Sequence, residues 1–390
     1  MTSSTMHTDH WHYFHGKPTI SAVLKASPAD FTVKEILTFE PLGEGEHVLV
    51  WLRKTELNTA FVAEQLAKFA QIPLRNVSYA GRKDKFAVTE QWFSLHMPGK
   101  DMPNWAEFNL PGAEVLKTQR HHKKLRPGNL DCNLFQITLR NLSNTDGLVE
   151  RLEKIKKEGV PNYFGPQRFG EIRLPAAPSD AGLQASSTSD IDDKNALAAS
   201  DTPAVTADTP AVKRRGGNLE LAQKMIDGET IRNRNKRSMA ISALRSWLFN
   251  EFIHGRIEHS LAQKCPLQSA MKGDLLMLNG SNSFFKCEEP DAMIQARLNE
   301  QDIQLSAPLW GKGELGSSEA ALALESSIAT AHPAQCALLE TLGLKQERRP
   351  IWLFPLKMHW ELNGDTLSLA FYLPPGCFAT SVLRELVTTD

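Results

Sequence analysis

The chain of 390 residues lacks any long hydrophobic run, which argues against a membrane-spanning helix because such a helix needs about 18 or more apolar residues in succession. The amino terminus, MTSSTMHTDHWHYFHG, also lacks the apolar core of a signal peptide. We therefore expect a globular protein that resides in the cytoplasm. Its length and its 41% of hydrophobic residues predict a substantial core and about two domains.

Cysteine is scarce and scattered. The five cysteines are Cys132, Cys265, Cys287, Cys336 and Cys377, and no two of them form a CxxC pair. This spacing argues against a zinc ribbon and a redox dithiol, so we expect free thiols. Histidine pairs such as His121 and His122, and the amino-terminal histidines His7, His10, His12 and His15, have no second ligand set spaced to join them. We expect no metal site.

The chain also lacks the overall basic charge that many nucleic-acid-binding domains carry, since its formal net charge is -1. Its basic residues are nevertheless gathered in four places. These are Arg82 with Lys83 and Lys85, residues 120–126, residues 213–215 and residues 232–237. Such clusters could form a phosphate-binding surface while acidic residues elsewhere cancel the total. Taken singly, each is more typical of a solvated face.

One segment lacks the aromatic residues that a core requires. Residues 174–217 are rich in Ala, Ser, Asp, Thr and Pro, and the sequence DTPAV occurs there twice. Such a segment buries too little apolar surface to offset the entropy lost on ordering. We predict a disordered loop inserted within a domain.

The rest of the chain shows clear periodicities. Alternation predicts strands over residues 46–55, 87–96, 133–142, 351–362 and 365–373, the last two joined in a hairpin at Asn363-Gly364. Helical spacing predicts helices over residues 58–69, 146–159, 233–253 and 378–386, with Asn58 as a cap for the first. Strands and helices do not alternate regularly, which favours an α+β fold with a largely antiparallel sheet.

The segment YAGRKDKFAVTEQ places Asp84 between Lys83 and Lys85, with Arg82 just before them. Neighbouring cations favour the ionised form of a carboxylate, which suits a nucleophile better than a general acid. A solvated turn is the alternative interpretation. Apolar residues precede this turn and a predicted strand follows it, so the turn is a plausible platform for a site. Which cation would pair with Asp84 is left open.

The strand of residues 133–142 places Asn133, Phe135, Ile137 and Leu139 on one face. A polar amide thus lies beside an aromatic ring among core positions. A buried amide needs a hydrogen-bond partner, which would be either a ligand or the neighbouring main chain.

Three segments taken together resemble the tRNA pseudouridine synthase D (TruD) family. They are GRKDK (residues 81–85), GVPNYFGPQRFG (159–170) and RNRNKRS (232–238), supported by DFTVKEIL (30–37), NTAFVAEQLAKF (58–69), AVTEQW (87–92) and PPGCFATSVLREL (374–386). The resemblance implies isomerisation of uridine to pseudouridine in tRNA, at uridine 13 of the D arm and in the glutamate tRNA for bacterial members. It implies no cofactor and tRNA as the partner, and we expect a monomer.

The resemblance also implies a fold in which residues 1–158 and 353–390 form a pseudouridine synthase catalytic domain. Residues 159–352 would form an inserted α/β domain that contains the predicted loop.

Site residues follow from the same likeness. Asp84 matches the family's catalytic position, while Phe31, Asn133 and Phe378 match substrate-contacting positions, and Phe135 lies beside them. Residues that would support the site or contact RNA are Arg82, Lys83, Lys85, Gln167, Arg168, Arg232, Arg234, Lys236 and Arg237. Whether Asp84 acts as a nucleophile or removes a sugar proton to leave a glycal is left open.

Two other functions compete with this interpretation. A retaining glycoside hydrolase would need a second carboxylate about 5 Å from the first, and Glu90 is the nearest in sequence. A non-catalytic module that binds or folds tRNA would keep the basic and aromatic residues without the reaction.

Overall fold

The computed structural model describes residues 6–170 and 217–389. The predicted loop of residues 174–217 lies outside these ranges except for Gly217, the first residue of α4 (Gly217–Ile226).

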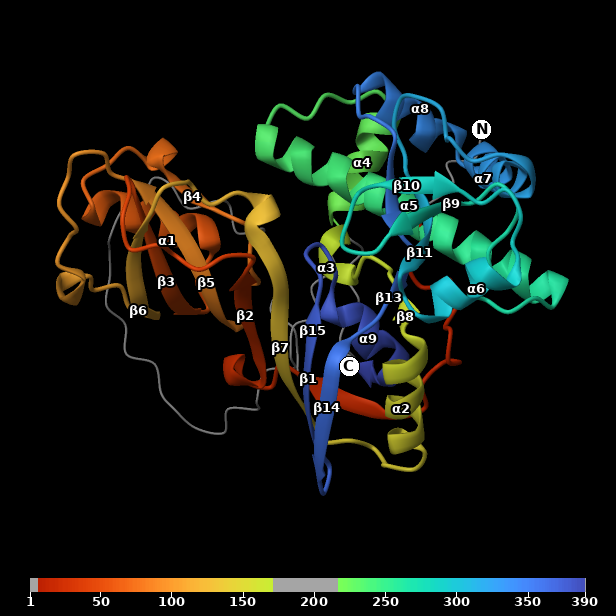
Figure 1. The fold of residues 1–390 in the computed structure, drawn as a ribbon, viewed down its shortest axis with the longest axis horizontal. Helices are drawn as coiled ribbons and strands as arrows, with labels where there is room; N and C mark the ends of the chain where they lie inside the picture. The colour runs from red at the N-terminus through yellow and green to blue at the C-terminus, as the bar shows by residue number, and fades with distance from the viewer. Residues whose placement is uncertain (1–5, 171–216, 390) are drawn as a thin grey trace, which may run out of the picture.

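A ten-stranded sheet is the largest element of the molecule (Figure 1). Its main order is β14 (Leu356–Asn363), β15 (Thr366–Leu373), β7 (Leu130–Arg140), β2 (Phe31–Leu37), β5 (Val88–His96), β3 (His47–Thr55) and β6 (Ala113–His121). At its margins β1 (Ser21–Leu24) pairs with β7 and with β16 (Thr388–Thr389), and β4 (Val77–Tyr79) pairs with β5. Among the strand pairs described for this sheet, β2·β5 and β1·β16 are parallel and the others antiparallel, so the predicted α+β fold with a largely antiparallel sheet is confirmed.

Strand β7 organises the central part of this sheet. It pairs with β2 on one side and β15 on the other, and its alternating residues Asn133, Phe135, Ile137 and Leu139 are all buried, as the sequence predicts. The predicted hairpin joins β14 to β15 at Gly364, whose φ of +60° favours glycine. Helices α2 (Leu148–Glu158) and α9 (Ala379–Leu386) complete the same hydrophobic core.

A second core lies beneath the other half of the sheet. Helix α1 (Thr59–Phe69) packs Val62 and Leu66 against Val50 of β3 and Phe93 of β5. Asn58 occupies the cap position of α1 as expected, but its side chain makes no capping hydrogen bond. The helix is therefore fixed by its apolar face and not by its cap.

The described residues of 163–170 and 217–352 build a separate core around the 30-residue helix α5 (Arg234–Gln263). A four-stranded sheet packs there in the order β10 (Phe284–Lys286), β9 (Leu275–Leu278), β11 (Ile303–Leu309) and β12 (Glu347–Pro350). The short helices are α3 (Pro166–Phe169), α4, α6 (Ala292–Asn299), α7 (Glu319–Ala331) and α8 (Pro333–Thr341). On the predicted stripe of α5, Leu244, Leu248 and Phe252 are buried and Ile241 is half-buried.

The chain passes between the large sheet and the region around α5 at β8 (Val160–Pro161) and at β13 (Trp352–Leu353), which lie side by side. β8 leads out of α2, and it pairs antiparallel with β13, which leads back towards β14. Residues near the amino terminus also cross over, since Trp11 is buried in the core around α5 and its Nε1 donates to Glu251 Oε1 at 2.8 Å.

Among the described residues, no helix has the length and apolarity needed to span a membrane. All five cysteines are free thiols, as the sequence predicts.

Candidate active site

Asp84 lies in the loop between β4 and β5, two strands that pair with each other, so the predicted charged turn between core strands is present. Its side chain is 21% exposed. Asp84 Oδ2 forms an ion pair with Lys25 Nζ and accepts a hydrogen bond from Gln167 Nε2 at 3.0 Å. Cation and amide converge on one carboxylate oxygen, and both come from outside the loop.

The cations next to Asp84 in sequence point elsewhere. Lys83 Nζ lies 2.6 Å from Glu35 Oε1, a carboxylate that is fully buried in β2. Arg82 and Lys85 are exposed, and within the described chain neither forms an ion pair with Asp84. Lys25, which follows β1 with a φ of +60°, takes the role that the sequence left open among Arg82, Lys83 and Lys85.

A second lysine that sequence reasoning missed lies behind the loop. Lys54 of β3 is 0% exposed, and its Nζ donates to the main-chain oxygen of Asp84 at 2.9 Å. Burial lowers the pKa of this ammonium group to about 8, with a further decrease from Lys83 and an opposing increase from Asp84. A signal for it exists in the sequence, because alternation places Lys54 on the inward face with Val48, Val50 and Leu52.

Two of the predicted aromatic positions adjoin this carboxylate. Lys25 Nζ lies 4.3 Å from the ring centroid of Phe31, and the ring of Phe31 meets that of Phe135 edge-on at 6.1 Å. Phe378, just before α9, is half-buried and packs on Phe164 at 5.5 Å. The site thus has apolar ring surfaces on the side of β2 and β7.

Asn133 lies directly opposite Glu35 in the β2·β7 pairing and is 7% exposed. Its Oδ1 is buried and makes no hydrogen bond to any residue that the structure describes. A buried amide oxygen without a protein partner is available to a ligand.

The segment GPQRFG connects the region around α5 to the Asp84 loop. A Cβ at Gly165 would lie 2.2 Å from Thr380 Oγ1, so only glycine permits this approach to α9. Gln167 then reaches Asp84, whereas Arg168 Nε donates to Ser246 Oγ of α5 at 3.1 Å. The neighbouring aromatic side chains, Tyr163, Phe164 and Phe169, are core residues.

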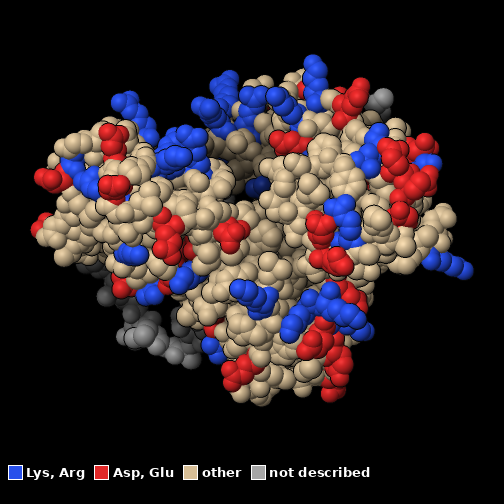
Figure 2. Space-filling view, viewed as in Figure 1, with Lys and Arg blue, Asp and Glu red and all other residues tan. Residues whose placement is uncertain are grey.

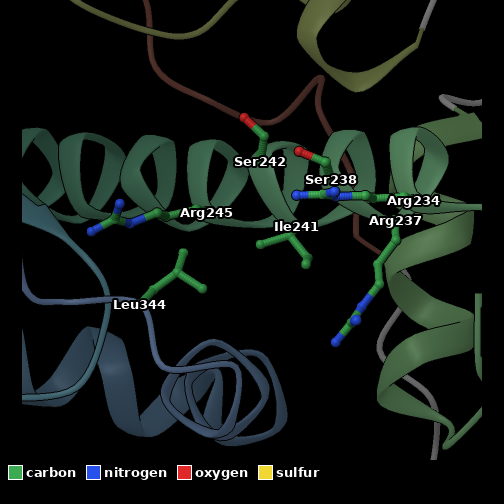
Figure 3. Close-up of a pocket in the computed structure, with 7 residues that line it drawn as sticks. All are labelled: Arg234, Arg237, Ser238, Ile241, Ser242, Arg245 and Leu344. Carbon is green, nitrogen blue, oxygen red and sulfur yellow. The ribbon is translucent and has the colours of Figure 1, made fainter.

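The predicted basic residues of 232–237 surround the first turn of α5. Arg232, Arg234, Lys236 and Arg237 are exposed and form no ion pair with any described residue. A hollow of about 360 Å³ lies here, lined by Arg234, Arg237, Ser238, Ile241, Ser242, Arg245 and Leu344 (Figure 3). Figure 2 shows a hollow between the β3–β6 region and the α4–α5 region, with Lys and Arg side chains gathered along its upper rim.

Glu90, the carboxylate nearest to Asp84 in the sequence, forms an ion pair with Arg53 at 2.8 Å. Alternation along β5 puts Glu90 on the face opposite Gln91, whose amide contacts the Asp84 loop.

Comparisons with known proteins agree with this geometry. A family model described as tRNA pseudouridine synthase D (TruD) matches residues 8–176 and 228–386. A relative of that name from Pseudoalteromonas atlantica is 47% identical over 385 residues, covering 99% of this chain and 98% of the relative. Another, from Shewanella oneidensis, is 44% identical and covers 96% of this chain and 88% of the relative. The chain belongs to the TruD family.

The predicted resemblance to TruD is therefore confirmed, and with it the expected enzyme class, an isomerase. The crystal structure of a Methanosarcina mazei protein matches with a TM-score of 0.61 at 21% identity, covering 96% of this chain and 95% of that one. This likeness shows that the fold is shared.

The amino-terminal histidine His12, for which the sequence spacing showed no further ligands, lies in a cluster with His254 and Glu258 of α5. His12 and His254 both approach Glu258 Oε1, at 3.6 and 3.5 Å. The main-chain N–H of His12 donates to His254 Nδ1 at 3.4 Å, so a neutral His254 carries its proton on Nε2, facing Glu258. This hydrogen bond and the two contacts with Glu258 hold the amino-terminal segment against α5.

Proposed function

We propose that this TruD protein converts uridine 13 in the D arm of tRNA to pseudouridine, with glutamate tRNA as a substrate and Asp84 as the catalytic carboxylate. The observation that carries this proposal is the position of Asp84, a partly exposed carboxylate held by Lys25 and Gln167 beside the aromatic ring of Phe31. The relatives named above are tRNA pseudouridine synthases, which supplies the reaction and the class of substrate.

The reaction breaks the bond between the sugar and nitrogen 1 of uracil, turns the base and joins the sugar to carbon 5. An ionised carboxylate serves either as a nucleophile or as the base that removes a sugar proton. In either route Lys25 stabilises the negative charge of Asp84 before the reaction, and Gln167 restrains the same oxygen. Asp84 Oδ1 would face the sugar. Among the described residues its hydrogen-bond donor is the Phe86 N–H, at 3.3 Å.

The target base must leave the RNA stack, at a cost of a few kcal/mol. Stacking on an aromatic ring returns about 1–3 kcal/mol per base, and Phe31, Phe135 and Phe378 are the rings that we assign to this role. Asn133 would recognise the uracil edge, because its buried Oδ1 can accept from the N3–H group of the base.

The tRNA itself would lie along the hollow of Figure 2, where basic side chains gather on both sides. Arg82 and Lys85 on the catalytic loop, together with Arg232, Arg234, Lys236 and Arg237 at the start of α5, would contact phosphates there. Lys83 and Arg168 would instead support the site, given their contacts with Glu35 and Ser246.

We also propose that residues 1–158 with 353–390 act as the catalytic domain and residues 159–352 as an inserted domain. The support for this division is the separate core around α5 and the β8–β13 pairing at the two crossings.

An assay on unmodified tRNA transcripts tests the proposal, with pseudouridine mapped by chemical modification and reverse transcription. We expect product at uridine 13 from the natural chain and none from Asp84→Asn or Asp84→Ala. Loss of product with unchanged tRNA affinity supports catalysis by Asp84. If both variants keep full activity, Asp84 is not the catalytic residue, and if the natural chain binds tRNA without making product, a binding module is the better description.

A further inference from the structure

Three buried polar side chains hold the main chain of the Asp84 loop, and each comes from a different element. Gln91 Nε2 of β5 donates to the oxygen of Gly81 at 2.8 Å, Thr59 Oγ1 of α1 accepts from the N–H of Lys83 at 3.0 Å, and Lys54 Nζ of β3 donates to the oxygen of Asp84 at 2.9 Å. The loop is therefore fixed at three points within four residues.

These three polar side chains are almost completely buried. Lys54 and Gln91 are 0% exposed and Thr59 is 3% exposed. Burying such groups is unfavourable unless they are hydrogen-bonded, and a lysine is rarely buried completely. Apolar residues at these positions would fill the same core without the free-energy cost of burying polar groups. Lys54 and Gln91 instead donate hydrogen bonds to main-chain oxygens of the loop, and not to those of a neighbouring strand.

Two of the three contacts, those of Thr59 and Gln91, are also connected to each other. The Thr59 hydroxyl donates its proton to Gln91 Oε1 at 3.0 Å while it accepts from Lys83, so its orientation is fully determined. Thr59 and Gln91 therefore restrain each other, and loss of one would weaken the contact that the other makes with the loop. Lys54 reaches the loop independently of them, at Asp84.

We propose that Lys54, Thr59 and Gln91 are positioning residues for Asp84, which hold the loop main chain so that the carboxylate keeps its place relative to the target sugar. This inference rests on the proposed function of Asp84. A reacting group must be held within a fraction of an ångström of its productive position, and a displacement of 1 Å can lower a rate about 100-fold.

Near-isosteric variants test the inference. Thr59→Val, Gln91→Met and Lys54→Met keep the volume and remove the bonds to the loop. We expect each to lower the single-turnover rate on saturating tRNA about 100-fold, with the Kd for tRNA changed less than about twofold. Thr59→Ser restores the hydroxyl and is expected to keep the rate within about threefold of the natural value.

The matched control is Thr89→Val. Thr89 is 0% exposed, lies opposite Lys54 in the β3·β5 pairing, and its Oγ1 makes no hydrogen bond to a described residue. We expect this variant to keep the rate within about twofold. If it loses as much rate as Thr59→Val, a general disturbance of the core explains the losses and the inference is overturned.

Hydrogen exchange separates this inference from the proposed function. The Lys83 amide is expected to exchange faster in Thr59→Val than in the natural chain, whether or not the protein acts on tRNA. Unchanged exchange together with an unchanged rate in Thr59→Val and Gln91→Met overturns the inference. Full activity of Asp84→Asn would instead contradict the proposed function, while faster exchange would still support the restraint of the loop.

Discussion

In the sequence Asp84 lies among three cations, but in the structure its carboxylate forms an ion pair with a lysine from elsewhere in the chain. Lys25 meets Asp84 Oδ2 from 59 residues away, and the same ammonium group lies over the ring of Phe31. One side chain thus connects the carboxylate to the aromatic wall of the site. An ion pair that is only partly exposed also retains more of its interaction energy than a solvated pair.

The role of Lys25 is tested by Lys25→Met. We expect kcat to fall about 10- to 100-fold because the carboxylate loses its electrostatic partner, while the Kd for tRNA changes less than about threefold. Lys34→Met is the control, since Lys34 also lies over an aromatic ring, that of Trp51 at 4.6 Å, and near a carboxylate, that of Glu90 at 3.9 Å. Equal losses in both variants would contradict a specific role for Lys25.

Replacing Asn133 is expected to lower the activity strongly but the stability only slightly. In Asn133→Leu we expect the rate to fall about 100-fold or more, because a site built to bond a polar base loses that bond. The free energy of unfolding should fall by less than about 1 kcal/mol, since the buried Oδ1 has no partner among the described residues to lose. Chemical denaturation beside the tRNA assay measures both quantities. A large loss of stability would indicate that the amide has a structural role.

Local patterns mark Asp84 and Asn133, whereas Gln167 is predicted as a support or RNA contact from the family resemblance, and Lys25 is not predicted. Asp84 lies in a charged turn, and Asn133 interrupts an apolar face. Lys25 and Gln167 are joined to Asp84 only by the fold, across 59 and 83 residues. No periodicity reports such a contact.

At the scale of elements, strand β3 carries the most unusual residue of the site. Lys54 occupies an inward position in a strand whose other inward residues are apolar. Its burial has a consequence for the stability of the whole protein.

Burial of Lys54 predicts a pH dependence of unfolding. Its pKa is lowered to about 8 in the folded chain from 10.5, so between these values the unfolded chain binds more protons and stability rises with pH. Over the full interval this contribution amounts to about 3 kcal/mol, at about 1.4 kcal/mol per pKa unit.

Comparison with Lys54→Met isolates the effect. We expect the free energy of unfolding of the natural chain to increase relative to that of the variant between about pH 8 and 10.5. Urea denaturation at several pH values measures the difference. Parallel curves for the two proteins would contradict a lowered pKa for Lys54.

Most elements could be predicted because their signals are local. The alternation of β7, the apolar stripe of α2 and the glycine of the β14–β15 turn each lie within about ten residues. The parallel pairing of β2 with β5 and the pairing of β8 with β13 could not, since both join distant segments. Asn58 does occupy the predicted cap position of α1, but its side chain makes no capping hydrogen bond, because packing of the apolar face determines where that helix lies.

At the scale of the molecule, the Asp84 loop lies where two regions meet. Gln167 comes from the segment that leads towards α5, while Lys25 and Asp84 belong to the region of the large sheet. The basic hollow of Figure 2 lies between these same regions. A substrate bound in the hollow would thus contact both of them, as an extended tRNA arm requires.

The basic residues at the start of α5 predict a salt dependence. Replacing Arg234 and Arg237 together by Ala should weaken tRNA binding and reduce the slope of log Kd against log salt by about 1–2, because each phosphate contact releases counterions. Arg297→Ala is the control, since Arg297 lies on α6 and pairs with Asp302 at 2.6 Å. An unchanged slope in the double variant would remove these arginines from the tRNA interface.

The central claim is that the protein isomerises a uridine of tRNA with Asp84 as the catalytic carboxylate, and one measurement tests it most directly. Purified natural chain and Asp84→Asn are incubated with the same glutamate tRNA transcript, and pseudouridine is quantified at every uridine. The account predicts stoichiometric pseudouridine at position 13 with the natural chain, and none with Asp84→Asn although it binds the transcript equally well. Pseudouridine at position 13 with Asp84→Asn at the natural rate would contradict the account.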